Sequence, residues 1–136
     1  MPEIRVWDDI DAEATLKTVV ENRDIVIGIK IRAVGSIAED LGIEAIKVAK
    51  DAGLPLMVHM GDGMTKAAMD IMDAFSLEVL NLLDEDDIIS HIYTGWPGSI
   101  IKPDGSVPHE LKKALERGVV RDTAYGIPNL SFIIDR

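Results

Sequence analysis

The most informative stretch of this chain is Leu54-Pro55-Leu56-Met57-Val58-His59-Met60-Gly61-Asp62-Gly63. An unbroken apolar run leads into a histidine, and a Gly-Asp-Gly turn follows at once. A short apolar run bounded by turn residues is typical of a buried strand in a parallel sheet. The pattern therefore predicts a strand whose carboxyl end carries His59 to the rim of the sheet.

Two other apolar runs end in the same way. The run Ile25-Val26-Ile27-Gly28-Ile29 ends on Lys30, and Asp87-Ile88-Ile89-Ser90 ends on His91. Ionisable side chains are rare in strongly apolar strands unless they have a partner. A lysine and two histidines at successive strand ends therefore predict one shared site.

Composition sets the class of protein. With 136 residues and 47% apolar content, we expect residues 1–136 to form a single domain with a real core. The net charge of −10 opposes binding to nucleic acid or to anionic membranes. The absence of cysteine excludes disulfides and thiolate metal sites. No leader pattern or membrane-length apolar run is present, so we expect a cytoplasmic protein that acts on a small molecule.

Helical and strand patterns alternate along the chain. Helices are predicted at residues 11–22, 36–52, 64–83 and 108–117, with a break possible at Gly42 and the third segment forming one long or two short helices. Strands are predicted at 25–31, 54–59, 87–92 and 119–122. Such alternation implies parallel strands with right-handed crossovers, in an open doubly wound sheet or in part of a barrel. No Gly-x-Gly-x-x-Gly fingerprint or Walker loop occurs, which weakens the nucleotide-binding form.

In a barrel, functional residues lie at the carboxyl ends of the strands, where Lys30, His59, His91 and Asp122 fall. Two neutral imidazoles with an oxygen donor form a common ligand set for Zn²⁺, Mn²⁺ or Fe²⁺. A lysine joins such a set only when its amine is carboxylated to an anionic carbamate. A metal pair bridged in this way would activate water for amide or ester hydrolysis.

Four residues at or near the predicted strand ends have two interpretations each. Arg32 binds a substrate carboxylate or forms a surface ion pair. Asp122 orients a histidine or caps its strand. Tyr93 and Trp96 line a substrate pocket or anchor the glycine- and proline-rich loop at 93–107.

Two further polar features are predicted to lie on the solvated surface. His109 lies at a helix start between Pro108 and Glu110. The acidic run Asp84-Glu85-Asp86-Asp87 lacks the alternating ligands and the glycine of a calcium loop, so a solvated turn is expected.

Three segments carry a resemblance to a known family. Val26-Ile27-Gly28-Ile29-Lys30-Ile31-Arg32, the stretch from Gly53 to Gly61, and Asp87-Ile88-Ile89-Ser90-His91-Ile92-Tyr93-Thr94-Gly95 resemble the amidohydrolase superfamily. Within it, the sequence is similar to the branch of deacetylase-like metallohydrolases related to dihydroorotases. The likeness continues through Asp104-Gly105 and Glu116-Arg117-Gly118-Val119 to Ser131-Phe132, in order and with similar spacing.

The resemblance implies a (β/α)₈ (TIM) barrel of which this chain supplies about half, strands four to seven. It implies that the strand-four lysine is carboxylated and bridges two metals, and that histidines of strands five and six ligate one of them. These roles fall on Lys30, His59 and His91. The family's His-x-His of strand one and proton-shuttling aspartate of strand eight have no counterpart here, so no catalytic residue is expected within the chain. Thr123-Ala124-Tyr125-Gly126 stands where relatives tend to have Gly-His-Gly.

Two functions are therefore expected. In the first, the chain is a fragment or shortened relative of a deacetylase-like enzyme that cleaves a small N-acyl or cyclic amide or ester, at bonds other than peptide bonds, using Zn²⁺ or another divalent ion, binuclear in the complete enzyme. In the second, it is a catalytically silent half-barrel that forms a homo-oligomer or joins a complementary half, because strands cut from a barrel leave two edges and an inner face uncovered. A third possibility, a flavodoxin-like binding domain, predicts helices on both faces of the sheet.

Overall fold

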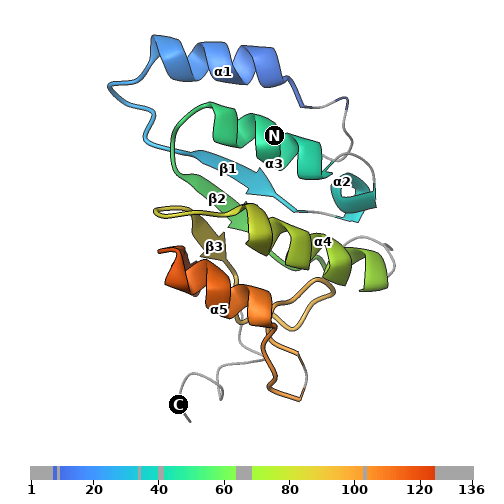
Figure 1. The fold of residues 1–136 in the computed structure, drawn as a ribbon. Coiled ribbons are helices and arrows are strands. Elements are labelled where there is room, and N and C mark those ends of the chain that lie inside the picture. The colour runs from blue at the N-terminus through green and yellow to red at the C-terminus, as the bar shows by residue number, and fades with distance from the viewer. Residues whose placement is uncertain are drawn as a thin grey trace.

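The computed structural model describes residues 8, 10–33, 35–39, 42–63, 69–102 and 104–124. Over these residues the chain forms a four-stranded parallel sheet in the order β1-β2-β3-β4 (Figure 1). The strands are β1 (Ile29–Arg32), β2 (Leu56–His59), β3 (Ile88–Ser90) and β4 (Val120–Asp122). The helices are α1 (Ala12–Glu21), α2 (Gly35–Glu39), α3 (Gly42–Asp51), α4 (Met69–Leu82) and α5 (His109–Glu116). The predicted α/β class with parallel strands is confirmed.

The labelled helices lie on one face of the sheet (Figure 1). Right-handed crossovers between strands that pair in chain order carry each connecting helix to the same side. Burial along β2 alternates accordingly, since Leu56 and Val58 are fully buried while Met57 and His59 are partly exposed. A doubly wound domain would have helices on both faces. The described part of the chain is therefore consistent with a partial barrel and not with the flavodoxin-like alternative.

The first strand begins later than predicted, at Ile29 instead of residue 25. A turn after α1 occupies the intervening residues, because the N–H groups of Ile25 and Val26 both donate to the carbonyl of Asn22. Pairing with the second strand starts only where the Ile29 N–H reaches the Pro55 carbonyl, at 3.0 Å. As a result Ile25 and Ile27 are 72% and 84% exposed, and the prediction that they belong to a buried strand is wrong.

The long predicted helix at 36–52 is divided into α2 and α3, with Gly42 as the first residue of α3. A Cβ atom at this position would lie 2.7 Å from the Ile37 carbonyl oxygen and 2.8 Å from Cε2 of Phe75. Gly42 therefore allows α2, α3 and α4 to approach closely, which explains the break that the sequence suggested. In the next predicted helix, α4 begins at Met69, and residues 64–68 lie outside the described part.

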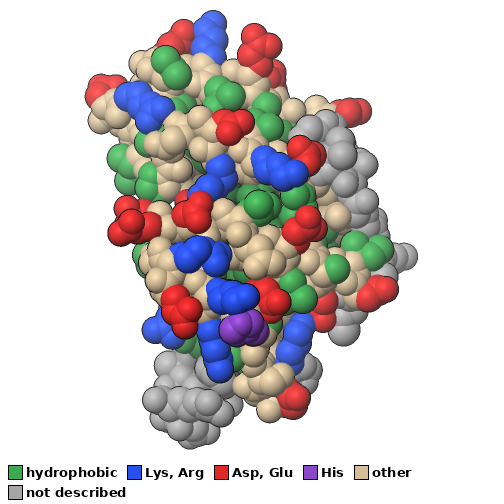
Figure 2. Space-filling model, in the orientation of Figure 1, with side chains coloured by type: hydrophobic (Ala, Val, Ile, Leu, Met, Phe, Trp, Pro, Cys, Tyr) green, Lys and Arg blue, Asp and Glu red, His purple; other side chains and the backbone are tan. Residues whose placement is uncertain are grey.

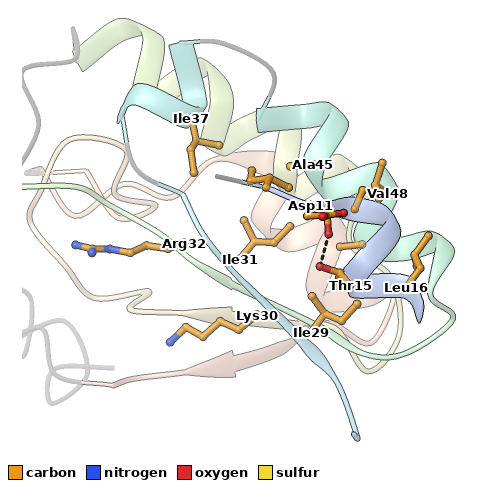
Figure 3. Close-up of a pocket in the computed structure, with 13 residues that line it drawn as sticks. Asp11, Thr15, Leu16, Ile29, Lys30, Ile31, Arg32, Ile37, Ala45 and Val48 are labelled. Atoms are coloured by element: carbon orange, nitrogen blue, oxygen red, sulfur yellow. Dashed lines mark hydrogen bonds between the residues drawn. The ribbon is translucent and has the colours of Figure 1, made fainter. Parts of the chain in front are cut away.

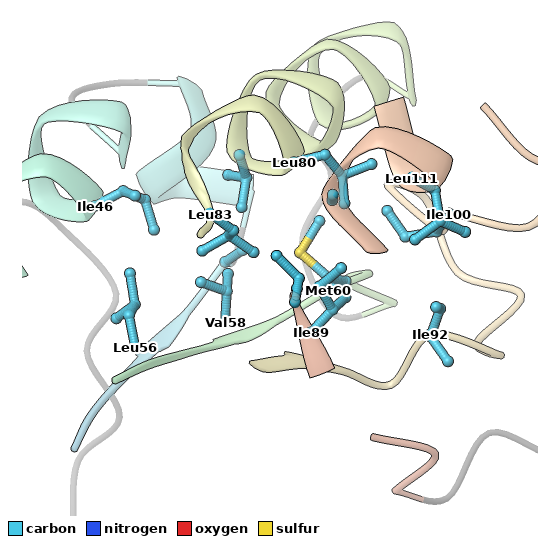
Figure 4. Close-up of a cluster of buried hydrophobic side chains, with 14 of the residues drawn as sticks. Ile46, Leu56, Val58, Met60, Leu80, Leu83, Ile89, Ile92, Ile100 and Leu111 are labelled. Carbon is cyan, nitrogen blue, oxygen red and sulfur yellow. The ribbon is translucent and has the colours of Figure 1, made fainter. Parts of the chain in front are cut away.

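The hydrophobic core lies between the sheet and the helices (Figure 4). Its fully buried side chains include Ile46 of α3, Leu56 and Val58 of β2, Leu80 of α4 and Ile89 of β3. Burying one such side chain contributes about 1.5–3 kcal/mol. Ile92 and Ile100 also belong to this core, so the connection after β3 is packed against the domain.

The acidic run before β3 is not simply a solvated turn, because its last residue, Asp87, is only 2% exposed. The Asp87 carboxylate accepts hydrogen bonds from the N–H groups of Leu56 and Asp84, at 2.8 and 2.9 Å, and pairs with the ammonium of Lys50. Partial burial disfavours the charge on Lys50, but the hydrogen bonds to Asp87 and Asp84 outweigh it and raise the pKa of Lys50. The earlier expectation holds only for the exposed residues of the run.

The end of α4 is held by a side chain from the next helical segment. The Arg117 guanidinium donates to the Leu80 carbonyl at 2.6 Å and to the Leu83 carbonyl at 2.8 Å. These carbonyls belong to the last turn of a helix, where backbone acceptors lack partners within the helix. Arg117 thus joins α4 to the turn that precedes β4.

Replacing Asp87 by alanine should destabilise the domain by about 3 kcal/mol, because it removes the acceptor for two backbone N–H groups and leaves Lys50 without its buried partner. Urea unfolding measures the change. The matched control is Asp51→Ala at an exposed aspartate, which should shift the free energy of unfolding by less than about 0.5 kcal/mol. Equal effects of the two substitutions would contradict a structural role for Asp87.

Candidate functional site

A row of polar residues crosses the sheet face that is turned away from the helices. The parallel register pairs Arg32 with His59, His59 with Ser90, and Ser90 with Asp122. Paired residues in adjacent parallel strands point to the same face. One polar side chain from each strand therefore stands in line near the carboxyl end of the sheet, where a barrel carries its function.

His91 follows this row directly and turns back towards it. Its backbone has φ of 63°, in the left-handed region that residues other than glycine seldom adopt. The ring centroids of His91 and His59 lie 4.1 Å apart, with the ring planes inclined at 49°. The two histidines predicted to converge are thus neighbours, and strained backbone of this kind occurs most often at functional sites.

Lys30 stands on the same strand and face as Arg32, two residues earlier. Figure 3 shows both side chains extending away from Ile29 and Ile31, which point towards the helices. The register pairs Lys30 with Met57, so the lysine lies one layer below His59. Lys30 and Arg32 are close enough for their charges to act on His59.

The His59 imidazole is held neutral. Burial lowers the pKa of His59 to about 4, and nearby positive charge at His91, Arg32 and Lys30 adds to this effect, while a backbone hydrogen bond with Gly61 opposes it. A neutral imidazole is the form that binds a metal ion. The environment of His59 therefore suits the ligand role that the sequence suggested for it.

Asp122 accepts a hydrogen bond from the Ser90 hydroxyl at 2.7 Å and another from the Ala124 N–H at 3.2 Å. The Ser90 hydrogen bond is the main cause of the lowered pKa of Asp122, to which His91 and Lys30 contribute electrostatically. The carboxylate stands in the row that contains His59 and beside His91. Its suggested role in orienting a histidine stays a prediction.

A hollow of about 520 Å³ opens beside the two imidazoles. Its lining comprises Arg32, His59, Met60, Gly61, Asp62, Gly63, His91, Thr94 and Trp96. Tyr93, by contrast, packs against the hydrophobic core, while Trp96 stands at the hollow. His109 is exposed on α5, on the helix face, where Figure 2 shows charges of both signs intermingled.

Asp62 is a site residue that the sequence pattern indicated only as part of a turn. It is 4% exposed, and its carboxylate accepts the Gly35 N–H at 2.8 Å while its own N–H donates to the Pro97 carbonyl at 2.9 Å. Asp62 therefore ties together the three loops that follow β1, β2 and β3. The sequence signal that could have indicated this role of Asp62 is an acidic residue between two glycines at the end of a strand.

A second, more apolar hollow of about 160 Å³ lies between α1, α3 and the outer strand β1 (Figure 3). Ile10, Leu16, Ile31, Ile37 and Val48 are among its lining residues. The histidines do not line it, and Lys30 lines this hollow and not the one beside the imidazoles, while Arg32 lines both. It lies along the side of β1 that does not pair with β2.

The relatives found by comparison with known proteins are named deacetylases. The chain is 30% identical over 136 residues to a protein named deacetylase from Agrobacterium fabrum, and the match covers 97% of this chain and 31% of that protein. A deacetylase from Brucella anthropi is also 30% identical, with 97% and 32% covered, and one from Enterococcus faecalis is 28% identical, with 96% and 34% covered. No protein-family model matches the sequence.

The chain is thus similar to deacetylases and spans about a third of the length of these curated relatives. The likeness supports the deacetylase-like part of the predicted family. Within the described residues, none of the helices combines the length and apolar character needed to cross a membrane.

In the metal-free protein, the His59 ring should titrate near pH 4, as followed by NMR of the imidazole nitrogens, with free histidine as the reference. Because an unperturbed histidine takes up its proton near pH 6.5, the unfolded chain gains this proton first as the pH falls. His59 should therefore cost the fold stability progressively from about pH 6.5 down to pH 4. A midpoint equal to that of free histidine would contradict the burial of its ring.

Proposed function

We propose that this chain is part of a metal-dependent amidohydrolase of the deacetylase type, which cleaves a small N-acyl or cyclic amide or ester. The observation that carries the proposal is the imidazole pair, with ring centroids 4.1 Å apart at the ends of adjacent strands. The names of the relatives add support for deacetylation. Since the chain spans about a third of those proteins, the complete activity would draw on further residues.

The donor set suits a divalent transition metal such as Zn²⁺. Two imidazoles are available, and the low pKa of His59 leaves its ring free of a competing proton at neutral pH. The described residues contain no group of three or more histidine, cysteine, aspartate or glutamate side chains that could hold a metal ion. A third ligand would therefore be Lys30 after carboxylation, or a group from a second segment. When bound, the ion would lower the pKa of a water and polarise a carbonyl.

The chain's own residues would position the substrate. Arg32 lines the hollow beside His59 and is suited to bind a carboxylate or amide oxygen. Ser90 holds Asp122 at the next position in the row, and Asp62 fixes the surrounding loops. A general acid or base is not assigned within the chain, as the resemblance also implied.

Protein purified with bicarbonate and Zn²⁺ should contain about one zinc ion per chain, measured by elemental analysis. His59→Ala should lose this metal because it removes one of two imidazole ligands. The matched control, His109→Ala, replaces an exposed histidine on α5 and should keep it. Wild-type protein without zinc, or zinc retained in His59→Ala, would count against the proposed site.

A second candidate function, association as a silent half-barrel, is favoured by the sheet face turned away from the helices, over which none of the described helices lies. Met57, Ile88 and Val120 stand in register as an apolar layer on this face, and Val120 is 48% exposed. Parallel sheets are normally covered on both faces. The two outer strands also differ in charge, since β1 carries Lys30 and Arg32 whereas β4 carries both Arg121 and Asp122.

Light scattering at micromolar concentration should then give the mass of a dimer or larger species. Val120→Lys should shift it to the monomer, because the substitution places a charge in the apolar layer. Val20→Lys is the matched control, since Val20 is 69% exposed on α1, away from this face. A wild-type monomer, or equal dissociation by both variants, would contradict association through this face.

A further inference from the structure

Trp96 presents an exposed aromatic face at the hollow beside the histidines. The residue is 57% exposed, although indole rings are usually well buried. Other exposed large apolar residues, such as Val20, Ile25 and Ile27, lie on α1 or just before β1, away from this hollow. The position of Trp96 next to His59 and His91 is therefore distinct from the scattered apolar surface elsewhere.

One side of the Trp96 ring rests on backbone. A Cβ atom at Gly63 would come within 2.2 Å of Cε3 and 2.4 Å of Cδ2 of the indole. A Cβ atom at Gly61 would come within 2.5 Å of Cγ2 of Thr94. The two glycines that flank Asp62 thus leave room for Thr94 and Trp96 to pack closely against the loop after β2.

The backbone around Trp96 is fixed as well. The Asp62 N–H donates to the Pro97 carbonyl, and the Ser99 N–H donates to the Trp96 carbonyl at 2.9 Å. Further along, the Ser76 hydroxyl of α4 donates to the Gly98 carbonyl at 2.7 Å. The backbone that carries the indole is consequently held in place before any ligand arrives, and a preorganised aromatic side chain loses little entropy on binding.

We propose that Trp96 forms the wall of a subsite for a flat apolar group, an aromatic ring in particular, that the substrate carries beside the bond to be cleaved. This inference rests on the proposed function, because it takes the hollow as the substrate site. Met60 and Thr94 also line the hollow, but both are buried, so Trp96 supplies its exposed apolar surface. Aromatic rings prefer offset stacking or edge-to-face contact with an indole, and both fit a ring with one free face. Among the small amides and esters of the proposed function, those that carry an aryl group are thus favoured over those that carry none.

Benzamide and acetamide provide a matched pair of probes, since both carry the amide but only one carries a ring. The chain has two tryptophans, so Trp7→Phe leaves Trp96 as the sole indole reporter. Benzamide should change the fluorescence of this variant saturably, and acetamide at the same concentration should not. No saturable change, or the same change with acetamide, would overturn the subsite.

Variants separate ring recognition from effects on folding. In calorimetric titrations, Trp96→Leu should weaken benzamide binding by about tenfold, while Trp96→Phe should restore most of it. Gly63→Ala keeps the indole but displaces it, and should weaken binding similarly with an unchanged circular dichroism spectrum. Unaltered affinity in both Trp96→Leu and Gly63→Ala would refute the proposal.

The same samples distinguish this inference from the proposed function. Benzamide binding in wild-type protein that takes up no zinc would overturn the metal site and leave the aromatic subsite standing. Zinc uptake that depends on His59, without benzamide binding, would overturn the subsite alone. A fluorescence change that depends on protein concentration and not on benzamide would show that Trp96 contacts a second protein chain, and it would also overturn the subsite.

Discussion

Right-handed crossovers between strands that pair in chain order carry every connecting helix to the same face of the sheet. Leu56, Val58 and Ile89 point towards those helices and make the core. The alternate positions are left on the opposite face, where the register aligns one polar residue from each strand. A parallel sheet normally has both of its faces covered. The face that contains the candidate site is therefore also the face suited to bind a partner.

Two buried carboxylates fix the two ends of this sheet. Asp87, before β3, binds the Leu56 N–H and Lys50 near the amino ends of the strands. Asp62, after β2, joins the loops at the carboxyl ends. In both cases the carboxylate can be buried because backbone N–H groups or a lysine bind it. A carboxylate is buried in a folded protein only when it has such partners. Stability at one end and positioning of the site at the other thus depend on the same kind of interaction.

The environment of the histidines combines features that are unfavourable for folding and useful for binding. Burial and nearby cations keep His59 neutral, and the left-handed backbone of His91 turns its ring towards His59. A chain selected for stability alone has no evident need of either feature. With the fixed indole of Trp96 at the same hollow, this arrangement favours a binding site over a structural cluster.

Local patterns were sufficient to predict the alternation of helices and strands, the parallel sheet, and the strand-end positions of His59 and His91, whereas Lys30 is the second residue of β1 and Arg32 stands at the end of that strand. These features follow from hydrophobic periodicity, glycine positions and chain connectivity, all of which act over a few residues. The start of β1 was missed because the turn after α1, held by Asn22, competes with an apolar run that otherwise suits a strand. The buried roles of Asp62 and Asp87 were missed for another reason. Their partners Gly35 and Lys50 are 27 and 37 residues away in the chain. Packing between these distant segments therefore decided which carboxylates are buried and how the loops at the carboxyl end of the sheet are held together.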